Sequence, residues 1–164
     1  MRLTKQTGYA LRILLHCAMA GDRLVKVPEV AKVHQITEHN VFKIIPLLVH
    51  GGFMTTTRGR GGGIRLAKPP EEIRIGAVVR VTEETRIEAD CYGGETANCP
   101  IRPAAPINRI LDEALDAFIE VLDQHTLKDL MSARPRWRAL LGPEPDGGEA
   151  VAARSGTPAA TGAA

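Results

Sequence analysis

Arg58-Gly-Arg-Gly-Gly-Gly-Ile-Arg65 decides the fold, because this basic, glycine-rich stretch lies between two runs that favour β-strands, residues 53–57 and 64–67. The pattern predicts a β-hairpin with arginines at its tip, the wing. A glycine-rich loop can also cradle a nucleotide phosphate in an enzyme. This loop lacks the Gly-Lys-Ser/Thr ending of such a site and does not join a buried parallel strand to a long helix, so the hairpin is favoured.

Two helices joined by a tight turn precede the wing. Apolar spacing predicts a helix over residues 4–20 capped by Thr4, and residues 28–34, which begin with a proline, form a short second helix. After a two-residue turn, Thr37 caps a third helix over residues 38–50. The second and third helices match a helix-turn-helix, and the wing behind them makes the predicted fold a winged helix.

The third helix has the two faces of a helix that reads DNA bases. Its inward positions are predicted to be Val41, Ile44, Ile45, Leu48 and Val49. Its outward positions on the first turns are Glu38, His39, Asn40 and Lys43. A recognition helix presents such positions to base edges. Pro46 is expected to kink this helix or loosen its middle turn.

The chain changes character after the wing. Residues 75–81 are predicted to form a fourth helix, and residues 82–105 are polar, lack periodicity and contain Cys91 and Cys99. Loops of that length inside compact domains are usually functional or disordered. The best amphipathic pattern of the chain follows over residues 106–123.

The apolar face of this long helix is broader than a small winged helix would cover. Its members are Ile107, Ile110, Leu111, Ala114, Leu115, Phe118, Ile119 and Leu122. We therefore predict that the helix packs against a second copy of itself in a homodimer, the alternative being a helix of the chain's own core. A final short helix is capped by Thr126 and Asp129.

The predicted plan has four parts: a winged helix-turn-helix DNA-binding domain over residues 1–81, a cysteine-containing sensor loop over 82–105, a dimerisation helix with a terminal helix over 106–141, and a disordered tail over 142–164. Eighteen of the 23 tail residues are Gly, Pro, Ala, Ser or Thr, too little apolar surface to order the segment. The fold class is mainly α with a small β-hairpin.

Charge is divided unequally along the chain. Residues 1–68 hold eleven Lys and Arg against three Asp and Glu, whereas residues 69–164 hold ten against sixteen. A basic surface on one part of a protein is the electrostatic signature of phosphate neutralisation. Double-stranded DNA is therefore the expected partner.

The chain reads as a cytoplasmic protein without a membrane partner. No apolar run approaches the roughly 20 residues of a membrane span, and the first residues do not lead into a secretory cleavage site. A reducing compartment and an odd count of three cysteines disfavour structural disulfides. Cys17 falls in the apolar stripe of the first helix and is expected to be a buried structural residue.

Four motifs together resemble a known family. They are Met1-Arg-Leu-Thr-Lys-Gln-Thr7, Arg58-Gly-Arg-Gly-Gly-Gly-Ile-Arg-Leu66, Val79-Arg-Val-Thr-Glu83 and Cys91-x7-Cys99-Pro100. Over about residues 1–141 the chain resembles the iron-sulfur-sensing winged-helix repressors, the family of IscR, NsrR and RirA, and it resembles the rhizobial iron regulator RirA most. The resemblance implies a homodimer whose recognition helices enter successive major grooves of a palindromic operator, with wing arginines in the minor groove.

Nine residues are predicted to contact DNA. They are Lys5, Thr37, His39, Asn40, Lys43, Arg58, Arg60, Gly61 and Gly62. Arginine side chains suit a narrow, electronegative minor groove, and Lys43 and Asn40 can donate to purine edges. Lys5, at the start of a helix, is placed to touch a phosphate.

Cys91 and Cys99 are predicted metal ligands, because the resemblance implies an iron-sulfur cluster in this loop. The family's third cysteine falls near Ala105, and a ligand from the first helix falls near Gly8. Iron-sulfur clusters normally take four protein ligands, and so do structural zinc sites, so two cysteines per chain are too few for either. The alternatives are a cluster completed by a histidine, by Asp90 or by the partner chain; a labile cluster with a small-molecule ligand; a thiol-disulfide switch; and loss of the cofactor.

The sequence thus predicts a dimeric, sequence-specific DNA-binding transcriptional regulator rather than an enzyme. The expected form is a repressor that responds to iron, iron-sulfur, redox or nitric-oxide status through the loop with Cys91 and Cys99, with iron homeostasis as the favoured role. One alternative is a cofactor-free DNA-binding regulator with a thiol switch. The other is a protein-interaction module of the same fold that has lost DNA binding.

Overall fold

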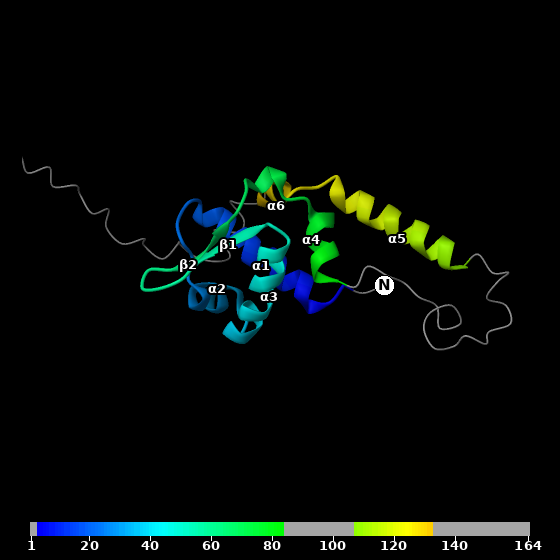
Figure 1. Cartoon of the computed structure of the whole chain (residues 1–164). Helices are drawn as coiled ribbons and strands as arrows, with labels where there is room; N and C mark the ends of the chain where they lie inside the picture. The colour runs from blue at the N-terminus through cyan, green and yellow to red at the C-terminus, as the bar shows by residue number, and fades with distance from the viewer. Residues whose placement is uncertain (1–2, 84–106, 133–164) are drawn as a thin grey trace, which may run out of the picture. The chain divides into compact units, whose positions relative to one another are not determined.

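The computed structural model describes residues 3–83 and 107–132, which form helices around one two-stranded hairpin (Figure 1). In chain order the elements are α1 (Lys5–Ala20), α2 (Val27–His34), α3 (Glu38–His50), β1 (Met54–Thr57), β2 (Gly63–Leu66), the 3-10 turn η1 (Pro70–Glu72), α4 (Ile75–Thr82), α5 (Ile107–Asp123) and α6 (Leu127–Met131). The predicted fold class, mainly α with a small hairpin, is confirmed. Residues of the cysteine loop beyond Glu83 and of the tail lie outside the described ranges.

Helix α1 is the central element of residues 3–83, which we call the head. The hydroxyl of Thr4 caps it by accepting the backbone N–H of Gln6 at 3.2 Å, and the helix ends at Gly21, whose φ is 61°. Its buried side chains are Thr7, Ala10, Ile13, Leu14, Leu15, His16 and Cys17. They occupy more than one stripe because α1 packs against α2, α3, α4 and α6 and against strand β2.

Helices α2 and α3 form the predicted helix-turn-helix, with α2 beginning one residue earlier than expected, at Val27. Gln35 makes the turn in the left-handed region, at φ 52°, and the hydroxyl of Thr37 caps α3 by accepting the N–H of Asn40 at 3.3 Å. Helix α3 continues through Pro46 to His50 without interruption.

One predicted inward position of α3 is wrong. The side chain of Val49 is 40% exposed, whereas its neighbour Leu48 is fully buried. The next residue of a helix is turned by about 100°, which carries Val49 past the edge of the stripe that α1 and α4 cover. The apolar face of α3 is therefore narrower than the sequence pattern suggested.

The wing strands pair antiparallel, with Met54 opposite Leu66 and Thr57 opposite Gly63. Strand β1 begins one residue later than predicted, and β2 begins and ends one residue earlier. Val25, in the connection between α1 and α2, pairs with the other edge of β2: its N–H and C=O each bond Ile64, both at 2.9 Å. Strand β2 is thus held on both sides.

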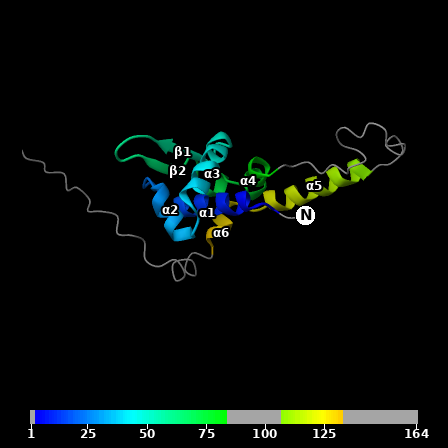
Figure 2. The same cartoon turned by 90° about the horizontal axis from the view of Figure 1, so that it is seen from below.

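Helix α5 packs on α4 through the second half of its length. Leu115 and Ile119 are buried against Val79 of α4, and part of the predicted apolar face lies outside this contact, as Ile110 is 48% exposed. Figures 1 and 2 both show α4 as the helix beside α5. Across residues 3–83 and 107–132, no helix is both long and apolar enough to cross a membrane.

The end of α5 is tied to both ends of α4 by polar contacts. The Arg80 guanidinium lies 2.6 Å from an Asp123 carboxylate oxygen, and Arg74 donates to the Asp123 carbonyl at 2.5 Å. Backbone bonds join Ile75 N–H to His125 C=O at 2.9 Å and Leu127 N–H to Ile73 C=O at 2.8 Å. The predicted cap of α6 is present, since the side chain of Thr126 and that of Asp129 each bond the other's backbone N–H. These contacts fix the direction in which α5 leaves the head.

Gly76 permits the close contact between α4 and α5. A β-carbon there would lie 2.8 Å from the Ile119 carbonyl oxygen and 2.7 Å from the carboxyl carbon of Asp123. We therefore predict that Gly76→Ala lowers the free energy of unfolding by about 2 kcal/mol, measured by urea denaturation, because the helices must separate.

Gly8→Ala is the matched control. Gly8 is also a helical glycine, in α1, but a β-carbon there meets no atom within 4 Å. This control is expected to raise the free energy of unfolding by roughly 0.5–1 kcal/mol through helix propensity alone. Equal effects of the two substitutions would show that the α4–α5 contact is not close.

Candidate nucleic-acid interface

The outward face of α3 is a continuous exposed stripe. Its members are Glu38, His39, Phe42, Lys43, Pro46, Val49 and His50, which recur at helical spacing. The opposite face is buried by Val41, Ile44, Ile45 and Leu48. The predicted contact residues His39 and Lys43 are therefore accessible, on one side of one helix.

Thr37 and Asn40 also have a structural role, because they form the amino-terminal cap of α3. The Thr37 hydroxyl accepts the Asn40 N–H, so one of its lone pairs serves the helix cap. The side chain of Thr37 remains exposed, and Asn40 is half-buried at the edge of the stripe. Both still border the surface that His39 and Lys43 present.

The two arginines at the wing tip are exposed to solvent. Arg58 and Arg60 are exposed, and neither makes a hydrogen bond or ion pair with any other described residue. Gly61 takes φ 112°, and the Gly62 N–H closes a turn on the Gly59 carbonyl at 2.9 Å. The tip is a compact turn with two guanidinium groups that no described acidic residue neutralises.

The wing is joined directly to the last turn of α3. The Phe53 N–H donates to the Leu48 carbonyl at 2.9 Å, and the Phe53 ring is buried. The Lys68 ammonium lies 4.9 Å from the centre of that ring, where cation–π attraction holds the returning chain. Helix α3 and the wing thus form one connected unit.

Lys5 lies apart from these residues. The carboxyl-terminal turn of α1 borders the hairpin, since Cys17 and Gly21 line a cavity there together with Arg65 of β2. Lys5 is exposed at the other end of the helix, about 18 Å along the axis from Cys17 at 1.5 Å per residue. The structure does not bring it together with the wing.

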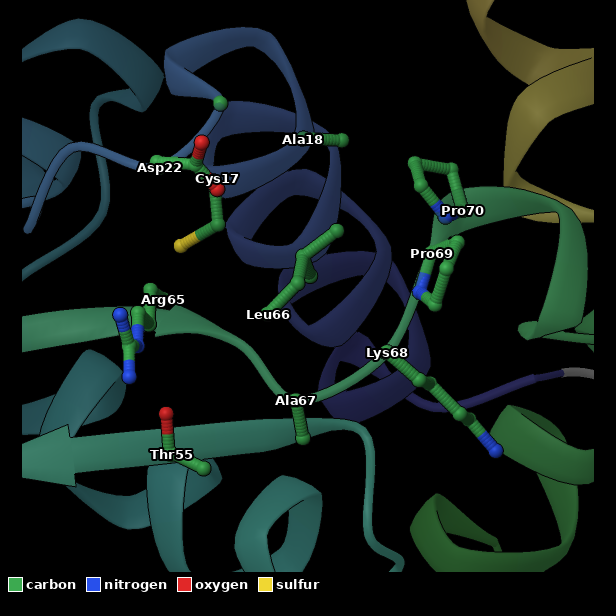
Figure 3. Close-up of a pocket in the computed structure, with 11 residues that line it drawn as sticks. Cys17, Ala18, Asp22, Thr55, Arg65, Leu66, Ala67, Lys68, Pro69 and Pro70 are labelled. Carbon is green, nitrogen blue, oxygen red and sulfur yellow. The ribbon is translucent and has the colours of Figure 1, made fainter.

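The cavity behind the hairpin has a volume of about 490 Å³ and is shown in Figure 3. Its wall includes Ala18 and Leu66 and the proline pair Pro69-Pro70. Arg65 borders it, so this arginine belongs to the base of the wing, in contrast to the two at the tip. The predicted burial of Cys17 is confirmed, and burial raises the pKa of its thiol to about 12, which leaves it uncharged.

A polar network between α1 and α2 went unpredicted. His16 Nε2 lies 3.0 Å from Glu29, His16 Nδ1 lies 3.2 Å from His34 Nε2, and two nitrogens of Arg23 donate to the Glu29 carboxylate at 3.0 and 2.7 Å. The Arg23 hydrogen bonds lower the pKa of Glu29 to about 2, and burial lowers that of His34 to about 4. An ionised Glu29 and a neutral His34 therefore lock α2 onto α1 at neutral pH.

Phe42 was also missed. It is 58% exposed on the outward face of α3, four residues before Pro46 and directly before Lys43. The signal was available in the sequence, because the spacing that turns His39 outward also turns the residue three positions later outward. An exposed aromatic ring on this face is an apolar surface next to a cation.

The predicted metal ligands Cys91 and Cys99 lie outside the described residues, as do Asp90 and Ala105. Within residues 3–83 and 107–132, no three His, Cys, Asp or Glu side chains cluster in a way that would hold a metal ion. Gly8 is exposed on α1 and offers no donor atom. The described part of the chain therefore contains no complete metal site of its own.

Comparison with known proteins identifies the architecture. The model of the Rrf2 family, described as an iron-dependent transcriptional regulator, matches residues 3–133. The chain is 44% identical to Protein aau3 of Rhizobium meliloti over 144 residues, covering 88% of this chain and 94% of that protein. It is 43% identical to the HTH-type transcriptional regulator NsrR of Halalkalibacterium halodurans over 142 residues, covering 86% and 97%.

A solved structure shows the same fold. CymR (YrzC), the global cysteine regulator of B. subtilis, superimposes with a TM-score of 0.60 at 26% identity, covering 80% of this chain and 97% of that one. The described helix-turn-helix and wing are thus shared with transcriptional regulators.

Proposed function

The chain belongs to the Rrf2 family of transcriptional regulators, which are not enzymes, and on that premise we propose that it is a dimeric repressor that reads a palindromic operator through α3 and the wing. The observation that carries this proposal is the pair of guanidinium groups at the wing tip, which have no partner among the described residues and lie on the hairpin that follows α3, a helix with an exposed outward face. Such a regulator acts in the cytoplasm, where the DNA is.

The side chains suggest a division of labour. Lys43 and Asn40 donate to purine edges in the major groove, and the ring of Phe42 meets a thymine methyl group. Arg58 and Arg60 enter the adjacent minor groove, where a narrow A·T-rich segment concentrates negative potential. The backbone of Gly61 and Gly62 allows the tip to approach the sugar-phosphate walls.

A second copy of the chain covers the free face of α5. The contact with α4 buries Leu115 and Ile119 but leaves Ile110 and Val121 48% and 55% exposed. Exposed apolar residues at helical spacing on a long helix favour pairing with an identical helix. A two-fold dimer would present two heads to two half-sites.

The sensing part of the proposal rests on the connection between the cysteine loop and the head. Glu83, the last described residue before that loop, accepts the Thr4 N–H at 2.8 Å and its hydroxyl at 2.9 Å, and also accepts the Thr7 hydroxyl. The Thr7 and Thr82 hydroxyls bond at 2.8 Å. We infer that a change in the loop reaches α1 through these contacts of Thr82 and Glu83 with Thr4 and Thr7.

The donor set decides what the loop can hold. Two thiolates per chain fall short of the four ligands of an iron-sulfur cluster, and Gly8 has no side chain that could supply a third. A cluster would therefore need further ligands from a histidine of this chain, from Asp90, from the partner chain or from a small molecule. Without them, Cys91 and Cys99 serve as a cofactor-free thiol switch. We propose iron, redox or nitric-oxide status as the signal in the first case and redox status in the second.

Arg58→Ala and Lys43→Ala test the DNA-reading surface. Each variant is expected to bind a selected genomic operator roughly tenfold more weakly in a mobility-shift assay, because a groove contact is lost, and to unfold at an unchanged temperature. Lys128→Ala, which removes an equal charge from α6, is the control and should bind normally. Unchanged DNA affinity in both Arg58→Ala and Lys43→Ala would contradict the proposal that α3 and the wing form the DNA-reading surface.

Anaerobic purification tests the sensor. If the loop holds a cluster, the protein should be coloured and contain iron and sulfide, and Cys91→Ser or Cys99→Ser should abolish both. A colourless protein whose DNA affinity changes on oxidation would support the thiol switch, provided that oxidation no longer changes the affinity of the Cys91→Ser and Cys99→Ser variants. A colourless protein indifferent to oxidation would contradict both forms of the sensor.

A protein-interaction module with the same fold remains the alternative function. It requires the basic tip to have lost its nucleic-acid partner, although Arg58 and Arg60 make no hydrogen bond or ion pair with other described residues. Screening genomic fragments for salt-sensitive binding separates the two, because only the regulator releases counterions from DNA.

A further inference from the structure

Lys26 contacts the wing from outside the hairpin. Its ammonium donates to the carbonyl oxygen of Gly62, the residue at which the tip turns back into β2. Lys26 precedes α2 as its N-cap residue, so this bond joins the start of the helix-turn-helix to the wing. The side chain is exposed, and within the described ranges this is its one hydrogen bond.

The neighbouring backbone makes the same connection. Val25 and Ile64 exchange two hydrogen bonds of 2.9 Å, and a β-carbon on Gly63 would lie 2.5 Å from the Val25 carbonyl oxygen and 3.2 Å from the β-carbon of Leu24. Only a glycine fits so close to another backbone. The chain from Leu24 to Lys26 therefore lies directly against the returning edge of the wing.

Without such contacts the tip would be loose. Arg58 to Gly62 contains three glycines, and two of them take positive φ. A glycine-rich loop loses much conformational entropy when a ligand orders it. A contact that orders the loop beforehand removes part of that cost from binding.

We propose that Lys26 is a wing-positioning residue: by holding the Gly62 carbonyl, it orients the tip so that Arg58 and Arg60 enter the minor groove. This inference rests on the proposed DNA-reading function and adds to it a residue of the α1–α2 connection that need not touch DNA. The competing role for an exposed lysine in this basic region is a direct phosphate contact, which predicts different measurements.

A double-mutant cycle distinguishes the two roles. Lys26→Met keeps the aliphatic length and removes the donor, and it is combined with Arg58→Ala/Arg60→Ala on one operator fragment. We expect Lys26→Met to weaken binding roughly fivefold when the wing arginines are present and by less than about twofold when they are absent. Lys26→Arg, which retains a donor, should restore most of the affinity.

Salt dependence supplies the second readout. A positioning residue leaves the slope of log affinity against log salt unchanged, whereas a lost phosphate contact reduces it by about one. Lys128→Met, on α6, controls for the loss of one positive charge outside the wing. Equal losses in both wing backgrounds, a reduced slope, or no loss at all would each overturn the positioning role.

A measurement on the free protein is independent of DNA binding. Lys26→Met should raise the amide hydrogen-exchange rate of the wing tip, residues 58–63, and leave that of the α3 core unchanged, since only the tip is released. Unchanged exchange at the tip would contradict the proposal even if affinity falls. Failure of the unmodified protein to bind any genomic fragment would instead remove the proposed function, whatever the exchange result.

Discussion

Burial of α1 is the constraint on which the rest of the structure depends. Helix α1 packs against α2, α3, α4, α6 and strand β2, so this one helix supports each element that presents a proposed functional group. The wholly buried Ile13, Leu14 and Cys17 fix its place, and a polar or smaller residue there would leave cavities beneath both the recognition helix and the wing. A rigid support of this kind is what allows exposed side chains to be aimed.

Two contacts extend that rigidity to the surface. Strand β2 is paired on both edges, by β1 and by Val25, and α2 is locked to α1 by the network around Glu29. The opposite end of α1 meets Glu83, where the cysteine loop begins. One helix therefore contacts both the elements proposed to read DNA and Glu83, from which the predicted cysteine loop continues.

Periodicity and caps predicted the helices well, because Thr4, Thr37 and Thr126 each bond the backbone N–H that their positions anticipate. Val49 was misplaced because spacing gives the direction of a side chain and not the width of the surface that covers it. The Lys26 contact and the His16 network join segments whose pairing depends on tertiary packing, so no local pattern could reveal them. The sequence offers Cys91 and Cys99 for the predicted metal site, and the remaining donor atoms of such a site depend on tertiary packing.

Chemical protection of a selected operator tests the central claim most directly. Dimethyl sulfate and hydroxyl radicals should reveal two half-sites about one helical turn apart, each with protected guanine N7 atoms in the major groove beside a protected stretch of minor groove. That pattern requires a dimer in which α3 and the wing both engage the duplex. A single unsymmetrical footprint, or protection confined to one groove, would contradict the account.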